Sequence, residues 1–194
     1  MVFRKVGGQI VASAYQKDVR DAKTPAQLTV RQKFAAAVLF YRTYANLLFI
    51  TLRQHLANQS AYNLFMKLNS PGSFNSDGSL IYDNLKIAKG NMGGTELTAA
   101  TASAGTGIIT LSWDDGAVPV GGAASDKLYA LVANVTSGTF RTYENVAIRS
   151  VGTIGIPVPD DTEEGDTLKV YYTFVSDVTD AVSDSVISTV TVAV

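Results

Sequence analysis

Few side chains in this 194-residue sequence are of types and spacings that support acid–base or nucleophilic chemistry. His55 is the only histidine, and no nucleophile-bearing turn follows it. There are no cysteines, which excludes a thiolate zinc site and a cysteine nucleophile. We therefore expect His55 to be structural and predict no catalytic residue.

The densest group of charges is an acidic run made of Asp160, Asp161, Glu163, Glu164 and Asp166. Oxygen-rich loops can bind Ca²⁺, but the Asp-x-Asp-x-Asp-Gly spacing of a calcium loop is absent. A hydrolase could use two carboxylates such as Asp160 and Glu163, although nothing in the sequence places them in a cleft. The preferred interpretation is a solvated turn, and we expect no enzyme activity, no metal and no cofactor.

Three arginines recur eleven residues apart, at Arg31, Arg42 and Arg53. On one continuous helix, eleven residues make about three turns plus 20°, so the three side chains would form one strip. Such a strip could bind an anion, but it is more often an ion-pairing face. The three arginines are therefore candidate interface residues.

The helix that would carry these arginines begins at Thr24-Pro25-Ala26-Gln27. This stretch combines a threonine cap, proline at the first helical position and a glutamine that closes a capping box. No further proline or glycine occurs before Pro71. We expect one long helix up to a break at 58–60, and a second, shorter helix from there to Leu68.

Two faces of the predicted long helix are apolar. One bears Phe34, Val38, Tyr41, Ala45, Leu48 and Leu52, and the other bears Ala36, Phe40, Tyr44 and Leu47. Either the rest of this chain or other subunits must cover the second face. A membrane span is not expected, because Arg42 would lie at its middle. Phe40, Tyr44 and Leu47 are therefore candidate interface residues.

The net charge of −1 hides a division of the chain into two oppositely charged halves. Residues 1–93 hold 12 Lys plus Arg against 4 Asp plus Glu, which is +8, whereas residues 94–194 hold 4 against 13, which is −9. The basic residues are dispersed and no nucleic-acid-binding motif occurs, so no specific nucleic-acid partner is expected. The division suits docking of the halves within one chain, or head-to-tail contact between copies.

Short β-forming runs occur at both ends of the chain. Val2–Val6 and Gln9–Ser13, separated by Gly7-Gly8, predict a β-hairpin, and Tyr15–Lys23 an extended polar arm. Leu80–Ala88 alternates apolar and polar residues and predicts a further strand with a bulge. From Thr95 onward the apolar period is two with frequent turn signals, which predicts a sandwich of seven or eight strands.

The predicted fold class is α+β in two parts. Residues 1–93 would form a hairpin-and-helix domain for docking or oligomerisation. Residues 95–194 would form an immunoglobulin-like β-sandwich that folds alone.

Several motifs carry a resemblance to known families. Ile109–Trp113, Lys127–Val132, Gly165–Tyr171 and Ser183–Val186 resemble strands B, C, F and G of a fibronectin type III-like domain. The whole chain is similar to a family of domains of unknown function seen in Bacteroidota and their phages, through Gly7-Gly8, Thr24–Phe34, Ser60–Asn63 and Ile81–Asp83. Helices with the spacing of Thr24, Gln27, Arg31 and Phe34 occur in other phage-encoded proteins. The resemblance implies a phage or mobile-element setting and brings no catalytic residues.

The function we expect is that of a non-enzymatic structural subunit, a phage virion component of head, collar or tail. Its partners would be further copies of itself or other virion proteins, with no membrane span. The N-terminal sequence lacks the apolar stretch of a signal peptide, so assembly in the host cytoplasm is expected. The alternative is a monomeric cytoplasmic module of a Bacteroidota cell that binds a protein or glycan through its sandwich loops.

Overall fold

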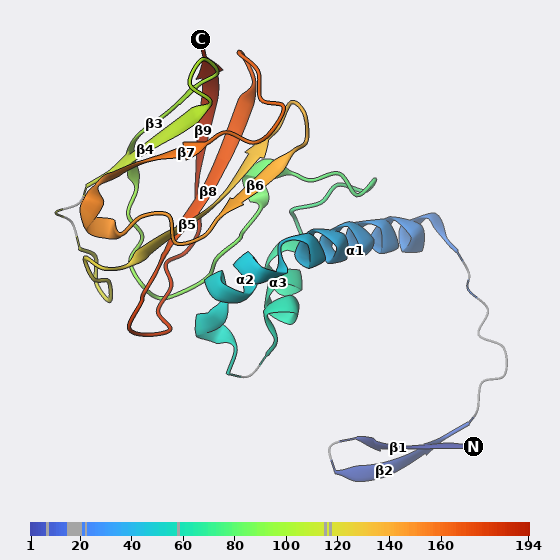
Figure 1. Ribbon diagram of the computed structural model, residues 1–194. Coiled ribbons are helices and arrows are strands. Elements are labelled where there is room, and N and C mark those ends of the chain that lie inside the picture. The colour runs from blue at the N-terminus through green and yellow to red at the C-terminus, as the bar shows by residue number, and fades with distance from the viewer. Residues whose placement is uncertain (7, 15–20, 22, 58, 115, 117) are drawn as a thin grey trace.

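The computed structural model describes residues 1–6, 8–14, 21, 23–57, 59–114, 116 and 118–194. A β-sandwich forms the body, a small group of helices covers one of its faces, and an N-terminal hairpin lies apart from both (Figure 1). The predicted α+β fold class is confirmed.

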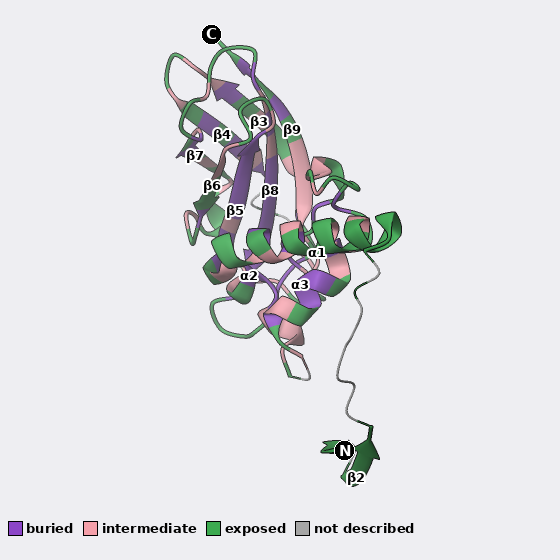
Figure 2. Cartoon of the chain, turned by 90° about the vertical axis from the view of Figure 1, so that its right-hand side faces the viewer, coloured by how far each residue is buried: buried purple, intermediate pink, exposed green. Residues whose placement is uncertain are grey.

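The hairpin consists of β1 (Val2–Val6) and β2 (Gln9–Ser13), paired antiparallel from Val6 opposite Gln9 to Val2 opposite Ser13. It matches the hairpin predicted from the sequence. Figures 1 and 2 both show it separated from the helices and the sandwich. Gly7 of the predicted turn, and all of the predicted arm except Asp21 and Lys23, lie outside the described residues.

Helix α1 spans Pro25–Thr43 and begins as predicted. The Thr24 hydroxyl accepts a hydrogen bond from the Gln27 N–H, and the Gln27 side chain accepts one from the Thr24 N–H, each at 3.3 Å. Because the cap satisfies two N–H groups that would otherwise lack a helical partner, it fixes the start of the helix.

The prediction of a single long helix is wrong, because the chain bends by 86° at Tyr44. After the bend come α2 (Ala45–Thr51) and a 3₁₀ turn, η1 (Arg53–His55). The bend places α2 against α3 and β8, where Leu47 and Leu48 are buried. Tyr44 keeps its helical hydrogen bonds, from its N–H to the Phe40 carbonyl and from the Leu48 N–H to its carbonyl, so tertiary burial of Leu47 and Leu48 is what favours the bend.

Within the described residues, no single helix is both long and apolar enough to cross a bilayer. Helices α1 and α2 reach that length and hydropathy only when they are counted together, across the bend.

Helix α3 (Ala61–Asn69) is capped by Ser60, whose hydroxyl accepts from the Asn63 N–H at 3.2 Å. The strand predicted over Leu80–Ala88 is absent; a 3₁₀ turn, η2 (Tyr82–Asn84), and extended chain take its place. The Asn69 side chain both donates to the Lys86 carbonyl at 2.9 Å and accepts from the Lys86 N–H at 2.8 Å. An amide side chain thus supplies the hydrogen bonds that a partner strand would have made.

Among the described residues, the sandwich has seven strands: β3 (Leu97–Ser103), β4 (Ile108–Trp113), β5 (Lys127–Asn134), β6 (Phe140–Tyr143), β7 (Thr153–Pro157), β8 (Thr167–Val175) and β9 (Val186–Ala193). A further 3₁₀ turn, η3 (Arg149–Val151), precedes β7. The strand order is β6-β5-β8-β9-β3-β4-β7, with antiparallel pairs except between β9 and β3. Strand β9 pairs with β8 along most of its length and with β3 only near its end, so one layer holds β6, β5, β8 and β9, and the other holds β3, β4 and β7 (Figure 1). Of the four segments that resemble fibronectin type III strands, the first two lie within β4 and β5, the third overlaps β8, and the last ends where β9 begins.

Two hydrophobic cores share the central strands. Inside the sandwich lie Trp113 and Phe174, 5.7 Å between ring centroids, with Leu128 and Val170. On the outer face of β5 and β8, Leu131 and Tyr171 pack with residues of all three α-helices. The two strands are therefore apolar on both faces (Figure 2). The helices share a core with the sandwich, and independent folding of residues 95–194 stays a prediction.

Candidate assembly surfaces

The N-terminal hairpin presents an apolar face to solvent. Its register places Phe3 opposite Ala12 and Lys5 opposite Ile10, so these four residues share one face. Phe3 and Ile10 are 67% and 77% exposed. A two-stranded hairpin is marginal in water unless something covers its apolar face. This face is therefore a candidate contact surface.

The first turns of α1 are exposed nearly all round (Figure 2). Leu28, Val30 and Phe34 are large apolar residues that the rest of the chain leaves exposed. The buried residues of α1 are Ala37 and Phe40, both in its C-terminal half. The chain thus covers only the C-terminal half of the predicted two-faced helix.

An apolar hollow of about 260 Å³ lies between α1 and the connection that follows α3. Its walls include Phe40, Tyr44, Leu80 and Phe140. The Phe140 ring packs edge-on against Phe40, with 5.7 Å between centroids. Leu39, 67% exposed, stands at its rim. Along α1 the hollow is lined only from Ala36 onward, next to the exposed first turns of the helix.

The structure places the three apolar interface candidates in different surroundings. Leu47 is fully buried in this chain's own core, and Phe40 is nearly so. Tyr44 is half-buried at the bend. The folded chain therefore covers much of the second apolar face itself. Participation of these residues in a subunit interface stays a prediction.

The three candidate arginines do not form the predicted strip, because the bend at Tyr44 turns Arg53 away from the line of Arg31 and Arg42. Arg31 binds the Asp21 carboxylate with two hydrogen bonds of 2.6 and 2.8 Å, and Arg42 is exposed. Arg53 donates to the carbonyls of Ser176 and Thr179. Arg53 thus joins the helices to the sandwich.

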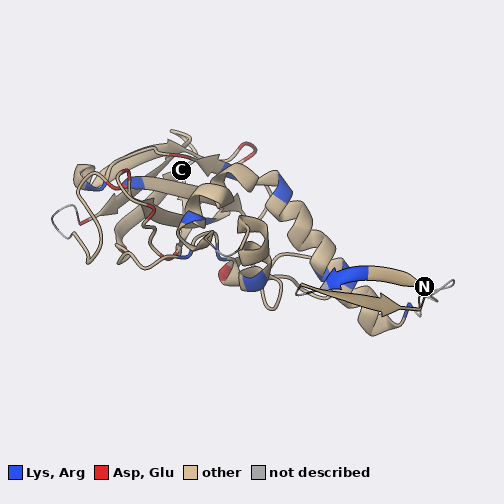
Figure 3. Cartoon of the chain, turned by 90° about the horizontal axis from the view of Figure 1, so that it is seen from below, with Lys and Arg blue, Asp and Glu red and all other residues tan. Residues whose placement is uncertain are grey.

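Ion pairs connect the two oppositely charged halves within this one chain. Lys89 Nζ lies 2.7 Å from Asp184 Oδ2, and Arg53 Nε lies 3.7 Å from Asp180 Oδ1. A third pair joins Lys169 of the acidic half to Asp83 of the basic half. Among the described residues, four cations of the hairpin and α1 make no ion pair: Arg4, Lys5, Lys33 and Arg42. Figure 3 shows basic residues on the hairpin and α1, and acidic residues in the connections of the sandwich.

The outer face of β3, β4 and β7 carries no charged side chain. The strand registers align three rows across it: Ala99–Ser112–Thr153, Thr101–Thr110–Gly155 and Ser103–Ile108–Pro157. Seven of these nine residues are exposed, and the largest of them, Ile108, is 42% exposed. We call this surface the uncharged face. The signal that could have revealed it is the run of small, neutral residues at alternate positions of three strands.

The acidic run lies directly beyond the uncharged face, because it begins three residues after Pro157 at the end of β7. Most of it is exposed, as predicted for a solvated turn. Asp160 lies 3.4 Å from Arg141, and its side chain is 92% exposed. Asp166 is the exception: it is buried, and its carboxylate accepts from the Glu163 N–H and the Asn134 amide. These two hydrogen bonds lower the pKa of Asp166.

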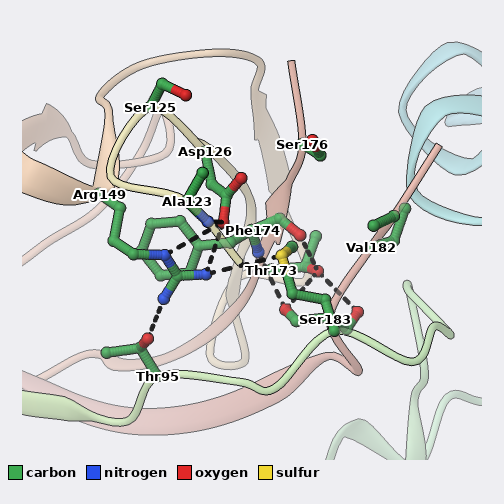
Figure 4. Close-up of polar contacts among 12 residues, drawn as sticks. Thr95, Ala123, Ser125, Asp126, Arg149, Thr173, Phe174, Ser176, Val182 and Ser183 are labelled. Carbon is green, nitrogen blue, oxygen red and sulfur yellow. Dashed lines mark hydrogen bonds and ion pairs between the residues drawn. The ribbon is translucent and has the colours of Figure 1, made fainter. Parts of the chain in front are cut away.

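A cluster of buried polar side chains lies inside the sandwich and connects segments from both of its layers (Figure 4). Arg149 and Asp126 form an ion pair with both side chains fully buried. The Arg149 guanidinium also donates to the Thr95 hydroxyl and lies over the Phe174 ring, 4.0 Å from its centroid. Burial lowers the pKa of Arg149, and the Asp126 carboxylate opposes this shift. Thr95 lines a hollow of about 350 Å³, but the Arg149 and Asp126 side chains are fully buried, so we interpret the cluster as a structural element.

Residues suited to catalysis or metal binding do not converge. His55 lies in η1 and is half-buried. Asp160 and Glu163, the carboxylates of the hydrolase alternative, are both exposed in their turn. Within the described ranges, no three His, Asp or Glu side chains are grouped closely enough to hold a metal ion.

Comparisons with known proteins give one family and four matching chains among solved structures, two of which are described here. A Fn3-like protein from Clostridium thermocellum matches at 12% identity and a TM-score of 0.35, covering 53% of this chain and 95% of that one. The adhesin domain of Epf from Streptococcus pyogenes matches at 14% identity and a TM-score of 0.36, covering 53% and 33%. No curated protein matches. A family model described as a family of unknown function, DUF6266, matches residues 7–188.

Proposed function

This chain belongs to the family of unknown function DUF6266, and within that family we propose that it serves as a non-enzymatic structural subunit of a larger assembly. The observation that carries the proposal is the apolar surface at its N-terminal end. The hairpin and the first turns of α1 expose Phe3, Ile10, Val30 and Phe34 to solvent. Exposed apolar groups of this kind mark surfaces that other protein covers.

The distribution of charge favours one orientation of neighbouring subunits in the proposed assembly. The hairpin and α1 form a basic end, with Arg4, Lys5, Lys33 and Arg42 outside any described ion pair. The turn at 158–166 forms an acidic end at the start of β8, whereas α2 and η1 lie near the end of β8. Opposite charges at two ends of one subunit favour head-to-tail contact over contact between like ends.

We further propose that the assembly is a phage virion. The support is the resemblance of the hairpin, the Thr24–Phe34 helix start and the Ile81–Asp83 segment to proteins of Bacteroidota and their phages. A repeated, non-enzymatic subunit with an outward sandwich suits a head, collar or tail component.

The test is the solution mass of the purified full-length chain, measured by light scattering over a range of protein and salt concentrations. We expect a mass well above the 20.6 kDa of one chain, rising with protein concentration and falling with added salt, because exposed charge pairs are screened. Virion proteomics of a phage encoding the chain should then detect it in purified particles.

A monomer at every concentration, absent from purified particles, would contradict the proposal. It would favour the alternative, a monomeric module that binds a protein or glycan through its sandwich loops. Glycan-array binding by that monomer would then identify the ligand class.

A further inference from the structure

We propose that the hairpin of one copy packs face to face on the uncharged face of β3, β4 and β7 in the next copy. This inference rests on the proposed function, and it names the two surfaces that meet. It makes the contact head-to-tail, since the two surfaces are different parts of the chain.

The two surfaces are matched in character. The hairpin offers Phe3, Ile10 and Ala12 on one face, with the aliphatic stem of Lys5 beside them. The uncharged face offers small or neutral side chains, with Thr110 at the centre of its middle row. The Ile108 side chain packs over Gly155, where an added Cβ would lie 3.1 Å from it, and the other exposed residues of the three rows are alanine, threonine and proline, which project little from the sheet. Large apolar side chains can therefore approach the sheet closely, as when two sheets stack.

Charge complementarity supports the same pairing. The hairpin bears Arg4 and Lys5, and the surface that receives it bears no charge of its own. The acidic run starting at Asp160 adjoins one border of the uncharged face, just past Pro157. Docking on α1 instead would bring the hairpin cations towards Lys33 and Arg42. Opposite charges at the border of an apolar contact favour the first arrangement and steer its formation.

A second copy, rather than the same chain, is the occupant that the architecture favours. The helices cover the outer face of β5 and β8, which belongs to one layer of the sandwich. The uncharged face is the outer face of the other layer. Figures 1 and 2 show the hairpin leaving on the helix side, away from β4 and β7. In both views the hairpin lies apart from the uncharged face of its own chain.

The test uses full-length chains altered on one surface each. The hairpin variant is Phe3→Glu with Ile10→Glu, and its control is Gln9→Glu with Ser13→Glu, which adds the same charge to the opposite hairpin face. The sheet variant is Thr110→Arg, and its control is Thr110→Val, which keeps a β-branched side chain. All five positions are exposed, so each variant should keep the wild-type thermal transition of the sandwich.

We expect the hairpin variant and the sheet variant each to fall to the mass of one chain, 20.6 kDa, while both controls keep the wild-type mass. Mixing the two variants in equal amounts should restore a species of two chains, because the hairpin of one and the sheet face of the other are intact. That complementation would be specific to a heterologous contact.

The outcomes separate this inference from the proposed function. A wild-type chain that assembles, with hairpin or sheet variants that assemble equally well, overturns the inference and leaves the structural-subunit proposal standing. Variants that dissociate but never pair on mixing also overturn it. A wild-type chain that is a monomer throughout overturns both.

Discussion

Arg149 Nη2 lies 3.3 Å from Asp126 Oδ2, and neither side chain has any solvent exposure. Moving two charges out of water costs several kcal/mol each, so the pair is stable only while both members are present. Trp113, the only tryptophan, donates from its indole N–H to the Arg149 carbonyl at 2.6 Å. Its fluorescence therefore reports directly on this part of the core.

We expect Asp126→Leu to lower the free energy of unfolding by about 3–5 kcal/mol, because it leaves the Arg149 charge buried without its partner. The double variant Asp126→Leu with Arg149→Met should lose much less, since no buried charge remains. Urea unfolding followed by Trp113 fluorescence measures both. Equal losses in the single and double variants would show that the charge pairing is not what matters here.

Two leucines on either side of the bend provide a matched comparison of burial. Leu47 is buried in the core beneath α2, whereas Leu39 is 67% exposed on α1. Leu47→Ala should cost about 2–5 kcal/mol of stability, and Leu39→Ala should stay within about 0.5 kcal/mol of wild type. Thermal or urea unfolding of the two purified variants checks the difference. A small effect at Leu47 would contradict the packing of α2 on the sheet.

The fragment 95–194 should fold with a cooperative thermal transition, because the inner core around Trp113 and Phe174 belongs largely to it. Its midpoint should lie below that of the full chain, since removal of the helices exposes Leu131 and Tyr171 on the outer face of β5 and β8. Circular dichroism of the fragment and the full chain measures both. A fragment without a transition would show that the sandwich depends on the helices.

Acid should destabilise the protein partly through Asp166, whose pKa is lowered by the Glu163 N–H and the Asn134 amide. A lowered folded-state pKa stabilises the fold above the ordinary carboxyl value of about 3.9, and this contribution is lost as the pH falls through the lower folded-state value. The wild type should therefore lose more stability than Asp166→Asn between about pH 5 and about pH 2. Urea unfolding at a series of pH values gives the two curves, and parallel curves would refute the assignment.

The sequence predicts those elements whose signals are local. The Thr24 capping box fixes the start of α1, and the period-two pattern of β4 and β8 identifies the sandwich. The bend at Tyr44 carries no local signal, because no glycine or proline marks it and only burial of α2 against distant strands favours it. For the same reason the arginine strip fails at Arg53, which lies beyond the bend.

The predicted strand at Leu80–Ala88 fails for a different physical reason. Leu85 and Ile87 alternate with polar residues because they enter the core. The backbone of Lys86, between them, is hydrogen-bonded to the Asn69 side chain, which a periodicity argument does not detect. Of the candidate assembly surfaces, the hairpin can be predicted from the sequence alone. The uncharged face needs the registers of β3, β4 and β7, which place residues from distant strands in the same rows.

Helix α1 also has a consequence for the geometry of any row of subunits. It carries the hairpin end of the chain at one terminus and meets the sandwich at the other. Its 19 residues span about 28 Å, and each residue adds about 1.5 Å and about 100° of rotation. The number of residues before Tyr44 therefore sets the distance of the start of the helix from the sandwich, and so contributes to the repeat of any row of subunits joined as proposed above. Insertions or deletions of three or four residues, close to one full turn, would change this distance while nearly preserving the direction in which the first turn faces.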